Sequence, residues 1–192
     1  MDINYIEKNT DSLIEYFETI DSTNERAKKI AEDLKQKNNK INLVIAENQL
    51  AGKGTKGRVW LSNKGENILM TIIFYPENLL EELDGITYKI AEMIKHAIKD
   101  LYNISLDIKF PNDLLLNNKK VCGILTESSI MKNRVNYLLI GIGFNVNQVD
   151  FPEVLNEIAT SLKKENLLDD YKREDIIIKI YNNIKSLIKN RI

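Results

Sequence analysis

The segment Ala51-Gly52-Lys53-Gly54-Thr55-Lys56-Gly57-Arg58-Val59-Trp60 carries the strongest signal in this chain of 192 residues. Three of the chain's eight glycines and three cationic side chains fall within seven positions of this segment. Closely spaced glycines let backbone N–H groups converge, and the cations add positive charge, so the segment suits a phosphate or a carboxylate. It is not a Walker loop, because residues 57–60 are expected to form a strand. A solvated basic turn explains the segment alone equally well.

The flanking sequence favours a binding loop. Strand-like apolar runs precede it at residues 42–49 and follow it at residues 67–75. A glycine-rich cationic loop between two buried strands is held at the mouth of a sheet. Trp60 at the end of the loop offers a flat face for a purine.

Four further segments accompany the loop: Asp21-Ser22-Thr23-Asn24, Lys109-Phe110-Pro111-Asn112-Asp113, Lys120-Val121-Cys122-Gly123-Ile124-Leu125 and Gly141-Ile142-Gly143-Phe144-Asn145-Val146-Asn147. The five segments resemble, in order and separation, the signatures of the catalytic domain of biotin protein ligases. These signatures are a Ser-Thr-Asn turn, Gly-Arg-Gly-x-x-Gly-Arg-x-Trp, Lys-Trp-Pro-Asn-Asp, Lys-Leu/Val-x-Gly-Ile-Leu and Gly-Ile-Gly-x-Asn. The resemblance spans residues 20–159. One such motif is weak evidence, whereas five in register are strong.

Periodicity predicts helices at residues 23–36, 85–102, 152–166 and 174–189. Strands are expected at residues 14–20, 42–49, 67–75, 105–110, 114–116, 121–128 and 137–145, with a hairpin turn at Asn117-Asn118-Lys119. Strands clustered mid-chain indicate an α+β fold, a sheet packed on one side by helices. The resemblance implies the same, a mixed β-sheet packed by helices as in class II synthetase-like biotin/lipoate ligases.

Bulk properties predict a single domain over residues 1–192 that works in the cytoplasm. The net charge of −1 argues against nucleic acid as a main partner. No stretch has the length and apolarity of a membrane span, and residues 1–7 do not look like a signal peptide. The lone cysteine, Cys122, is expected to be a small buried side chain, and the lone histidine, His96, to be solvated. Compared with the family, we expect neither an N-terminal DNA-binding domain nor a C-terminal β-barrel.

The resemblance implies an ATP-dependent ligase with Mg²⁺. Biotin would be activated as biotinyl-5′-AMP and then passed to a lysine of a biotin carboxyl carrier domain of an acyl-CoA carboxylase. A homodimer is expected, since the family often forms one and short strands beside the loop offer an edge. The alternative is a lipoate or octanoate ligase or transferase of the same fold, although such an enzyme would have an apolar pocket. A non-catalytic binder would be expected to lack Lys120, and a nucleic-acid-binding module is opposed by the charge.

The resemblance assigns catalysis to Lys120 and Arg58, with the Lys120 ammonium bridging the biotin carboxylate and the α-phosphate. Without the Gly123-Ile124-Leu125 that follows, Lys119 and Lys120 would be ordinary turn lysines. Ser22 and Glu25 also fit a capping box, which would leave Thr23 and Asn24 unexplained. The expected biotin-binding residues are Ser22, Thr23, Asn24, Gln49, Gly52, Lys53, Gly54, Thr55, Lys120 and Gly123.

The nucleotide site is expected to combine loop cations with residues from the later motifs. The implied ATP-binding residues are Lys53, Lys56, Arg58, Trp60, Lys109, Asn112, Asp113 and Asn145. Mg²⁺ would be held through the phosphates of ATP, with Asp113 as a candidate ligand. Asn112 and Asp113 are also ordinary turn residues after a proline. Two positions depart from the family: Phe110 replaces tryptophan, and Thr55 replaces a frequent arginine.

Overall fold

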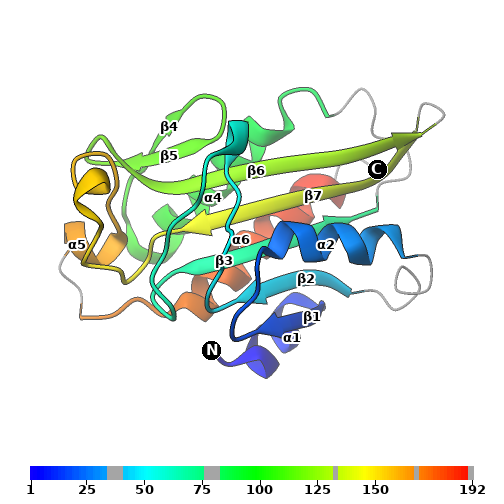
Figure 1. Cartoon of the computed structure of the whole chain (residues 1–192), viewed down its shortest axis with the longest axis horizontal. Coiled ribbons are helices and arrows are strands. Elements are labelled where there is room, and N and C mark those ends of the chain that lie inside the picture. Colours follow the sequence, from blue (N-terminus) through cyan, green and yellow to red (C-terminus); the bar gives the residue numbers. More distant parts are fainter. Residues whose placement is uncertain (34–40, 76–82, 132–133, 167–168, 190–192) are drawn as a thin grey trace.

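The computed structural model describes residues 1–33, 41–75, 83–131, 134–166 and 169–189. Within them, β1 (Leu13–Phe17), β2 (Ile41–Ala46), β3 (Ile68–Phe74), β4 (Asp107–Lys109), β5 (Asp113–Leu116), β6 (Lys119–Met131) and β7 (Arg134–Phe144) form one sheet (Figure 1). Its order is β1-β2-β3-β7-β6-β5-β4. The β1–β2 pair is parallel, and the other pairs are antiparallel. The mixed sheet of the prediction is confirmed.

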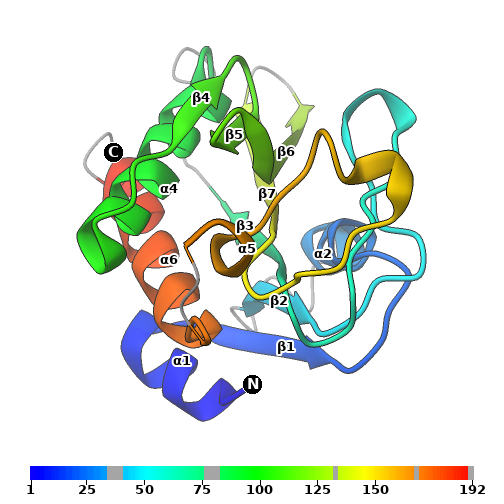
Figure 2. The same ribbon diagram turned by 90° about the vertical axis from the view of Figure 1, so that its left-hand side faces the viewer.

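Helices cover both faces of the sheet, so the expectation of one-sided packing was wrong. Figure 2 shows α1 (Ile3–Thr10), α4 (Ile86–Tyr102) and α6 (Arg173–Lys189) on one side and α2 (Thr23–Glu32) on the other. The larger core lies under α1, α4 and α6. A smaller core joins Ala27 and Ile30 of α2 to Ile73 and Leu139 of the sheet. The amphipathic stripe of α2 therefore buries against the second face.

Most expected elements are present with shifted ends. The helix expected at 85–102 is α4, and His96 on it is exposed. The helix expected at 174–189 is α6, and that expected at 23–36 is α2 up to Glu32, with residues 34–36 outside the described residues. The hairpin turn is confirmed, because Asn117 and Asn118 have φ of 50° and 64°, a conformation that asparagine tolerates.

Three local predictions were wrong. Residues 57–60 form no strand: Thr55–Gly57 is a short 3₁₀ turn, η1, and Val59 makes only an isolated bridge to Lys53. Residues 152–166 are not one helix but the 3₁₀ turn η2 (Glu153–Leu155) and the short helix α5 (Leu162–Asn166). Helix α1 was not expected, although the Asp2 side chain caps it by accepting from the Tyr5 N–H at 3.0 Å.

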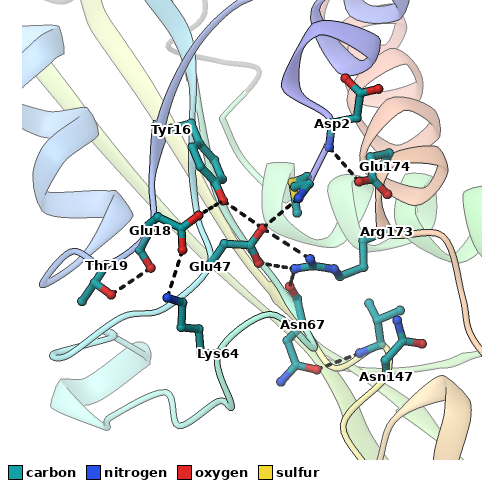
Figure 3. Close-up of polar contacts among 12 residues, drawn as sticks. Asp2, Tyr16, Glu18, Thr19, Glu47, Lys64, Asn67, Asn147, Arg173 and Glu174 are labelled. Atoms are coloured by element: carbon teal, nitrogen blue, oxygen red, sulfur yellow. Dashed lines mark hydrogen bonds and ion pairs between the residues drawn. The ribbon is translucent and has the colours of Figure 1, made fainter.

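A buried ion pair joins Glu47, directly after β2, to Arg173 at the start of α6 (Figure 3). The Arg173 guanidinium donates to Glu47 Oε2 at 2.6 Å and to Glu47 Oε1 at 3.3 Å, and the Tyr16 hydroxyl donates to Oε1 at 3.1 Å. Arg173 also donates to the Asn67 carbonyl at 3.0 Å. Burial alone would raise the pKa of Glu47, but the hydrogen bonds from Arg173 hold it below its ordinary value. This cluster fixes one end of the sheet.

Cys122 lies in β6 and is fully buried, as expected. Burial raises the pKa of its thiol, which disfavours the reactive thiolate. Within the described ranges, no helix combines the length and apolarity needed to cross a membrane.

Candidate functional site: two cavities joined at Lys120 and Trp60

A cavity opens on the face of the sheet that carries α2. Its walls come from the start of α2, the glycine loop and the facing strands β6 and β7. Eleven residues predicted to bind biotin or ATP line it: Ser22, Thr23, Asn24, Gln49, Lys53, Gly54, Thr55, Trp60, Asn112, Lys120 and Gly123. The sequence motifs therefore converge on one cavity, which we call the first cavity.

One end of the first cavity is polar and built on the start of α2. Ser22 caps the helix by accepting from the Glu25 N–H at 3.5 Å. Gln49 Oε1 accepts from the Thr23 N–H at 2.8 Å and the Thr23 hydroxyl at 3.0 Å. Asn24 is 5 % exposed and hydrogen-bonded to strands on both sides. Only the first half of the predicted capping box is present, because the Glu25 carboxylate pairs elsewhere.

Three glycines of β6 and β7 make room for the side chains above them. A Cβ at Gly141 would collide with the Asn24 amide. A Cβ at Gly143 would lie 2.5 Å from Trp60 Cε2, and one at Gly123 would lie 2.8 Å from Trp60 Cζ3. The indole thus rests on bare backbone. Gly123, which was expected to bind biotin, lines the first cavity, and the space above it is taken by Trp60 and Lys120.

A second cavity adjoins the first. Gly54, Thr55, Trp60 and Lys120 line both. Of the other predicted residues, Arg58 and Asn145 line the second cavity. The buried Asn145 amide donates to the Thr160 carbonyl at 3.0 Å, which leaves its Oδ1 without a hydrogen-bond partner among the described residues.

Lys120 occupies the boundary between the cavities. Its Nζ lies 2.7 Å from Asp113 Oδ1, an ion pair rather than an aligned hydrogen bond, and 5.3 Å from the Trp60 ring centroid. Its backbone is fixed from a distant segment: the Lys120 N–H donates to the Ile158 carbonyl at 2.8 Å, and its carbonyl accepts from the Thr160 N–H at 2.9 Å. The ammonium is therefore held on a rigid strand between two hollows.

The three cationic side chains of the glycine loop do not converge on one cavity. Lys53 Nζ pairs with Glu25 Oε1 across the rim of the first cavity, and the hydrogen bond from Lys53 lowers the pKa of Glu25. The Arg58 guanidinium turns back to Thr55, donating to its hydroxyl at 3.0 Å and its carbonyl at 3.3 Å. Lys56 is exposed, with φ of 57°, and lines neither cavity.

The remaining predicted residues lie around the cavities. Gly52 is buried behind the loop, where its carbonyl accepts from the Trp60 N–H at 2.9 Å. Lys109 is exposed at the end of β4 and lines neither cavity. Asn112 donates to the Ile124 carbonyl at 3.1 Å, which ties the turn to β6. Asp113 reaches the site through Lys120.

No described group of three or more His, Cys, Asp or Glu side chains is placed to hold a metal ion. Asp113 offers a carboxylate beside both cavities through its ion pair with Lys120. One carboxylate fits a Mg²⁺ ion that keeps waters and is bound mainly through substrate phosphates.

Sequence reasoning missed the apolar walls. Met70, Leu125 and Ile142 line the first cavity, and Val59, Leu61, Phe151, Leu155 and Ile158 line the second. The apolar runs of β3 and β7 predicted strands but could not tell a cavity wall from the core. The second wall includes Leu155, Ile158 and Ala159, which lie within the helix predicted at residues 152–166. Long-range hydrogen bonds from Lys119 and Lys120 help to shape that segment.

Comparison with known proteins agrees with these motifs. The family model described as "Biotin/lipoate A/B protein ligase family" matches residues 16–145. The chain is 39 % identical over 151 residues to the bifunctional ligase/repressor BirA of Bacillus subtilis, covering 78 % of this chain and 46 % of that protein. It is 35 % identical over 128 residues to the biotin–[acetyl-CoA-carboxylase] ligase of Paracoccus denitrificans, covering 66 % and 51 %. The chain spans about half the length of these relatives.

A solved structure shares the fold. The biotin protein ligase of Aquifex aeolicus in complex with biotin and ATP aligns with a TM-score of 0.74 and 28 % identity, covering 92 % of this chain and 70 % of that one. The mixed sheet packed by helices is thus the fold of that ligase. Since the family description covers residues 16–145, more than half of the sequence, the chain belongs to the biotin/lipoate A/B protein ligase family.

Proposed function

We propose that the protein is a biotin protein ligase. In the proposed first step, a biotin carboxylate oxygen attacks the α-phosphate of MgATP, forming biotinyl-5′-AMP and releasing pyrophosphate. In the second, the ε-amine of a carrier lysine attacks the acyl carbon, forming an amide and releasing AMP. A relative named as a biotin–[acetyl-CoA-carboxylase] ligase and a relative solved with biotin and ATP support this assignment.

The position of Lys120 is the observation that carries the proposal. It lines both cavities, so one ammonium can contact an acid in the first and a phosphate in the second. Two anions repel each other, and a fixed cation between them lowers the barrier to their reaction. We assign the biotin carboxylate and the α-phosphate to its two sides. Asp113 would hold the ammonium in place before the substrates arrive.

The two cavities differ in chemistry, which supports the assignment of the ligands. The first has a polar end built from Thr23, Asn24 and Gln49, matching the ureido ring of biotin. The second is lined by Val59, Leu61, Phe151, Leu155 and Ile158, with Asn145 as a polar partner, and suits a purine. We assign ATP to the second cavity, with Arg58 near its phosphates and Mg²⁺ entering as MgATP. A wholly apolar first cavity would have favoured lipoate.

The remaining parts of the proposal concern partners and place of action. We propose a biotin carboxyl carrier domain of an acyl-CoA carboxylase as the acceptor, by analogy with the name of the Paracoccus relative. A homodimer, action in the cytoplasm and no binding of DNA remain predictions from the sequence.

Labelling of a carrier domain tests the proposal. The purified protein is incubated with MgATP, biotin and a biotin carboxyl carrier domain, and the intact mass of the carrier is measured. We expect one biotinyl group per carrier, lost when the acceptor lysine is changed to arginine. Lipoylation of a lipoyl domain from lipoate, without biotinylation, would favour the alternative of the same fold.

A further inference from the structure

Asn24 is held between two strands of the sheet. It lies over Gly141 of β7, where a Cβ would collide with the amide. Its Oδ1 accepts from the Thr71 hydroxyl of β3 at 2.6 Å, and its Nδ2 donates to Glu127 Oε2 of β6 at 2.9 Å. Thr71 and Leu125 both pair with Gly141, and Glu127 stands two positions along β6 on the same face. The amide thus has a partner on each side.

Glu127 determines which way the amide faces. An ionised carboxylate only accepts hydrogen bonds, so the Asn24 group that faces it must be the NH₂. The amide oxygen must then face Thr71 and the polar end of the first cavity. Glu127 is half-buried and does not line that cavity, so its influence on a ligand passes through Asn24.

Four side-chain oxygens, beginning with that of Asn24, form a hydrogen-bonded chain that has one proton fewer than it has contacts. Asn24 Oδ1, Thr71 Oγ1, Thr23 Oγ1 and Gln49 Oε1 follow one another at 2.6, 2.9 and 3.0 Å. The Thr23 N–H fixes Gln49 Oε1 as an acceptor. Two hydroxyl groups supply two protons for three contacts. The polar end therefore has a surplus of acceptors.

We infer that Glu127 is a positioning residue that makes this end of the cavity select ligands with N–H donors. The inference rests on the proposed function, because the ureido ring of biotin carries two N–H groups, whereas the dithiolane ring of lipoate carries none. Without the Glu127 carboxylate, the Asn24 side-chain amide flips, so that its oxygen and its NH₂ group exchange places. Its NH₂ then supplies the missing proton to Thr71, and the surplus acceptor is lost. The ureido group then meets a donor where it needs an acceptor.

Two substitutions separate orientation from charge. Glu127→Met removes the acceptor at similar length, whereas Glu127→Gln keeps an acceptor oxygen without the charge. In biotin-dependent exchange of pyrophosphate into ATP, we expect Glu127→Met to raise the KM for biotin about tenfold or more, and Glu127→Gln to raise it less. The KM for ATP and the kcat should not change. Glu32→Met is the matched control, since Glu32 accepts from the Tyr137 hydroxyl and lines neither cavity.

A double substitution tests whether Glu127 acts through Asn24. In an Asn24→Ala background, Glu127→Met should have no further effect on the KM for biotin. Dethiobiotin keeps the ureido group but lacks the ring sulfur, so its KM should rise by the same factor as that of biotin. An unchanged KM for biotin, an equal rise in the KM for ATP, or an effect that persists without Asn24 would overturn the inference.

Calorimetric binding of biotin separates this inference from the proposed function. If the wild type binds biotin without supporting exchange, the ligase proposal fails, and the ratio of the Kd values of Glu127→Met and wild type still tests Glu127. If the wild type supports exchange and Glu127→Met binds biotin equally well, the ligase proposal stands and the inference fails. If the wild type does not bind biotin, both fail.

Discussion

Lys120 and Asp113 form an ion pair of 2.7 Å at the boundary of the two cavities. The Lys120 side chain is 28 % exposed, and the Asp113 side chain is 15 % exposed. The Asp113 carboxylate orients Lys120 between the two cavities before any substrate binds. Such preorganisation is what electrostatic catalysis requires, because the protein does not reorganise as charge develops.

Lys120→Met should lower biotin-dependent pyrophosphate exchange about a hundredfold or more without unfolding the protein. Lys119→Met is the matched control from the same hairpin. Lys119 donates to the Asn156 carbonyl at 2.9 Å and lines neither cavity, so its loss should change exchange little. Initial rates and circular dichroism of both variants decide the matter. Equal losses would return Lys120 to the role of a turn lysine.

Gly143→Ala should displace the indole above it. The added methyl group would lie 2.5 Å from Trp60 Cε2, so the ring must move. Trp60 is the only tryptophan, so its emission maximum reports the movement directly. We expect a shifted emission and reduced exchange in Gly143→Ala. The double variant with Trp60→Leu should regain stability relative to Gly143→Ala alone, and unchanged emission in Gly143→Ala would contradict this packing.

Thr55→Arg should lengthen retention of biotinyl-AMP. Thr55 stands where the family often has arginine, and here its hydroxyl holds Arg58 back at 3.0 Å. An added cation at the boundary can form a charge-assisted hydrogen bond with the adenylate, worth about 1.5–3 kcal/mol, or roughly ten- to a hundredfold in off-rate. Biotin blotting of albumin added during turnover measures escape. The account is wrong if the wild type labels no albumin or the variant labels as much.

Arg173→Met should destabilise the fold by about 1.5–3 kcal/mol, because it removes the nearer of the two cations that pair with the buried Glu47 carboxylate and leaves the N-terminal ammonium of Met1 at 3.4 Å. Arg26→Met is the control, since the Arg26–Glu15 pair is more exposed and should cost about 1 kcal/mol or less. Urea unfolding gives both values.

The same ion pair predicts the acid dependence of stability. The folded pKa of Glu47 is held below its ordinary value of 4.5. Its stabilisation is therefore complete above about pH 4.5 and is lost as the pH falls through the lower folded pKa. The Glu47→Gln/Arg173→Met variant should lose this part of the acid dependence, and an unchanged profile would contradict the assignment.

The sequence predicted whatever depends on local periodicity and motif spacing. The apolar stripe of α4 and the turn at Asn117-Asn118 are local signals, and both were located correctly. The segment from Ile158 to Thr160 was expected to be helical, but it pairs with the backbone of Lys120. A contact between residues so far apart in the chain leaves no periodic trace. The packing of α2 on the second face of the sheet was missed for the same reason.

The candidate site was predictable as a list of residues but not as an arrangement. The motifs gave Asn24, Trp60 and Lys120, yet nothing local indicated that Gly141 makes room for the first and Gly143 for the second. Glu127 was missed because a lone carboxylate on a strand has no sequence signature. Its significance arises only from the Asn24 amide opposite it.

Exchange of labelled pyrophosphate into ATP tests the central claim most directly. The protein is incubated with MgATP and labelled pyrophosphate, with biotin, with lipoate or with neither. The account predicts rapid exchange with biotin, little with lipoate and none without an acid, because only the bound carboxylate can attack the α-phosphate. Exchange that is the same without biotin, or that requires lipoate instead, would contradict it.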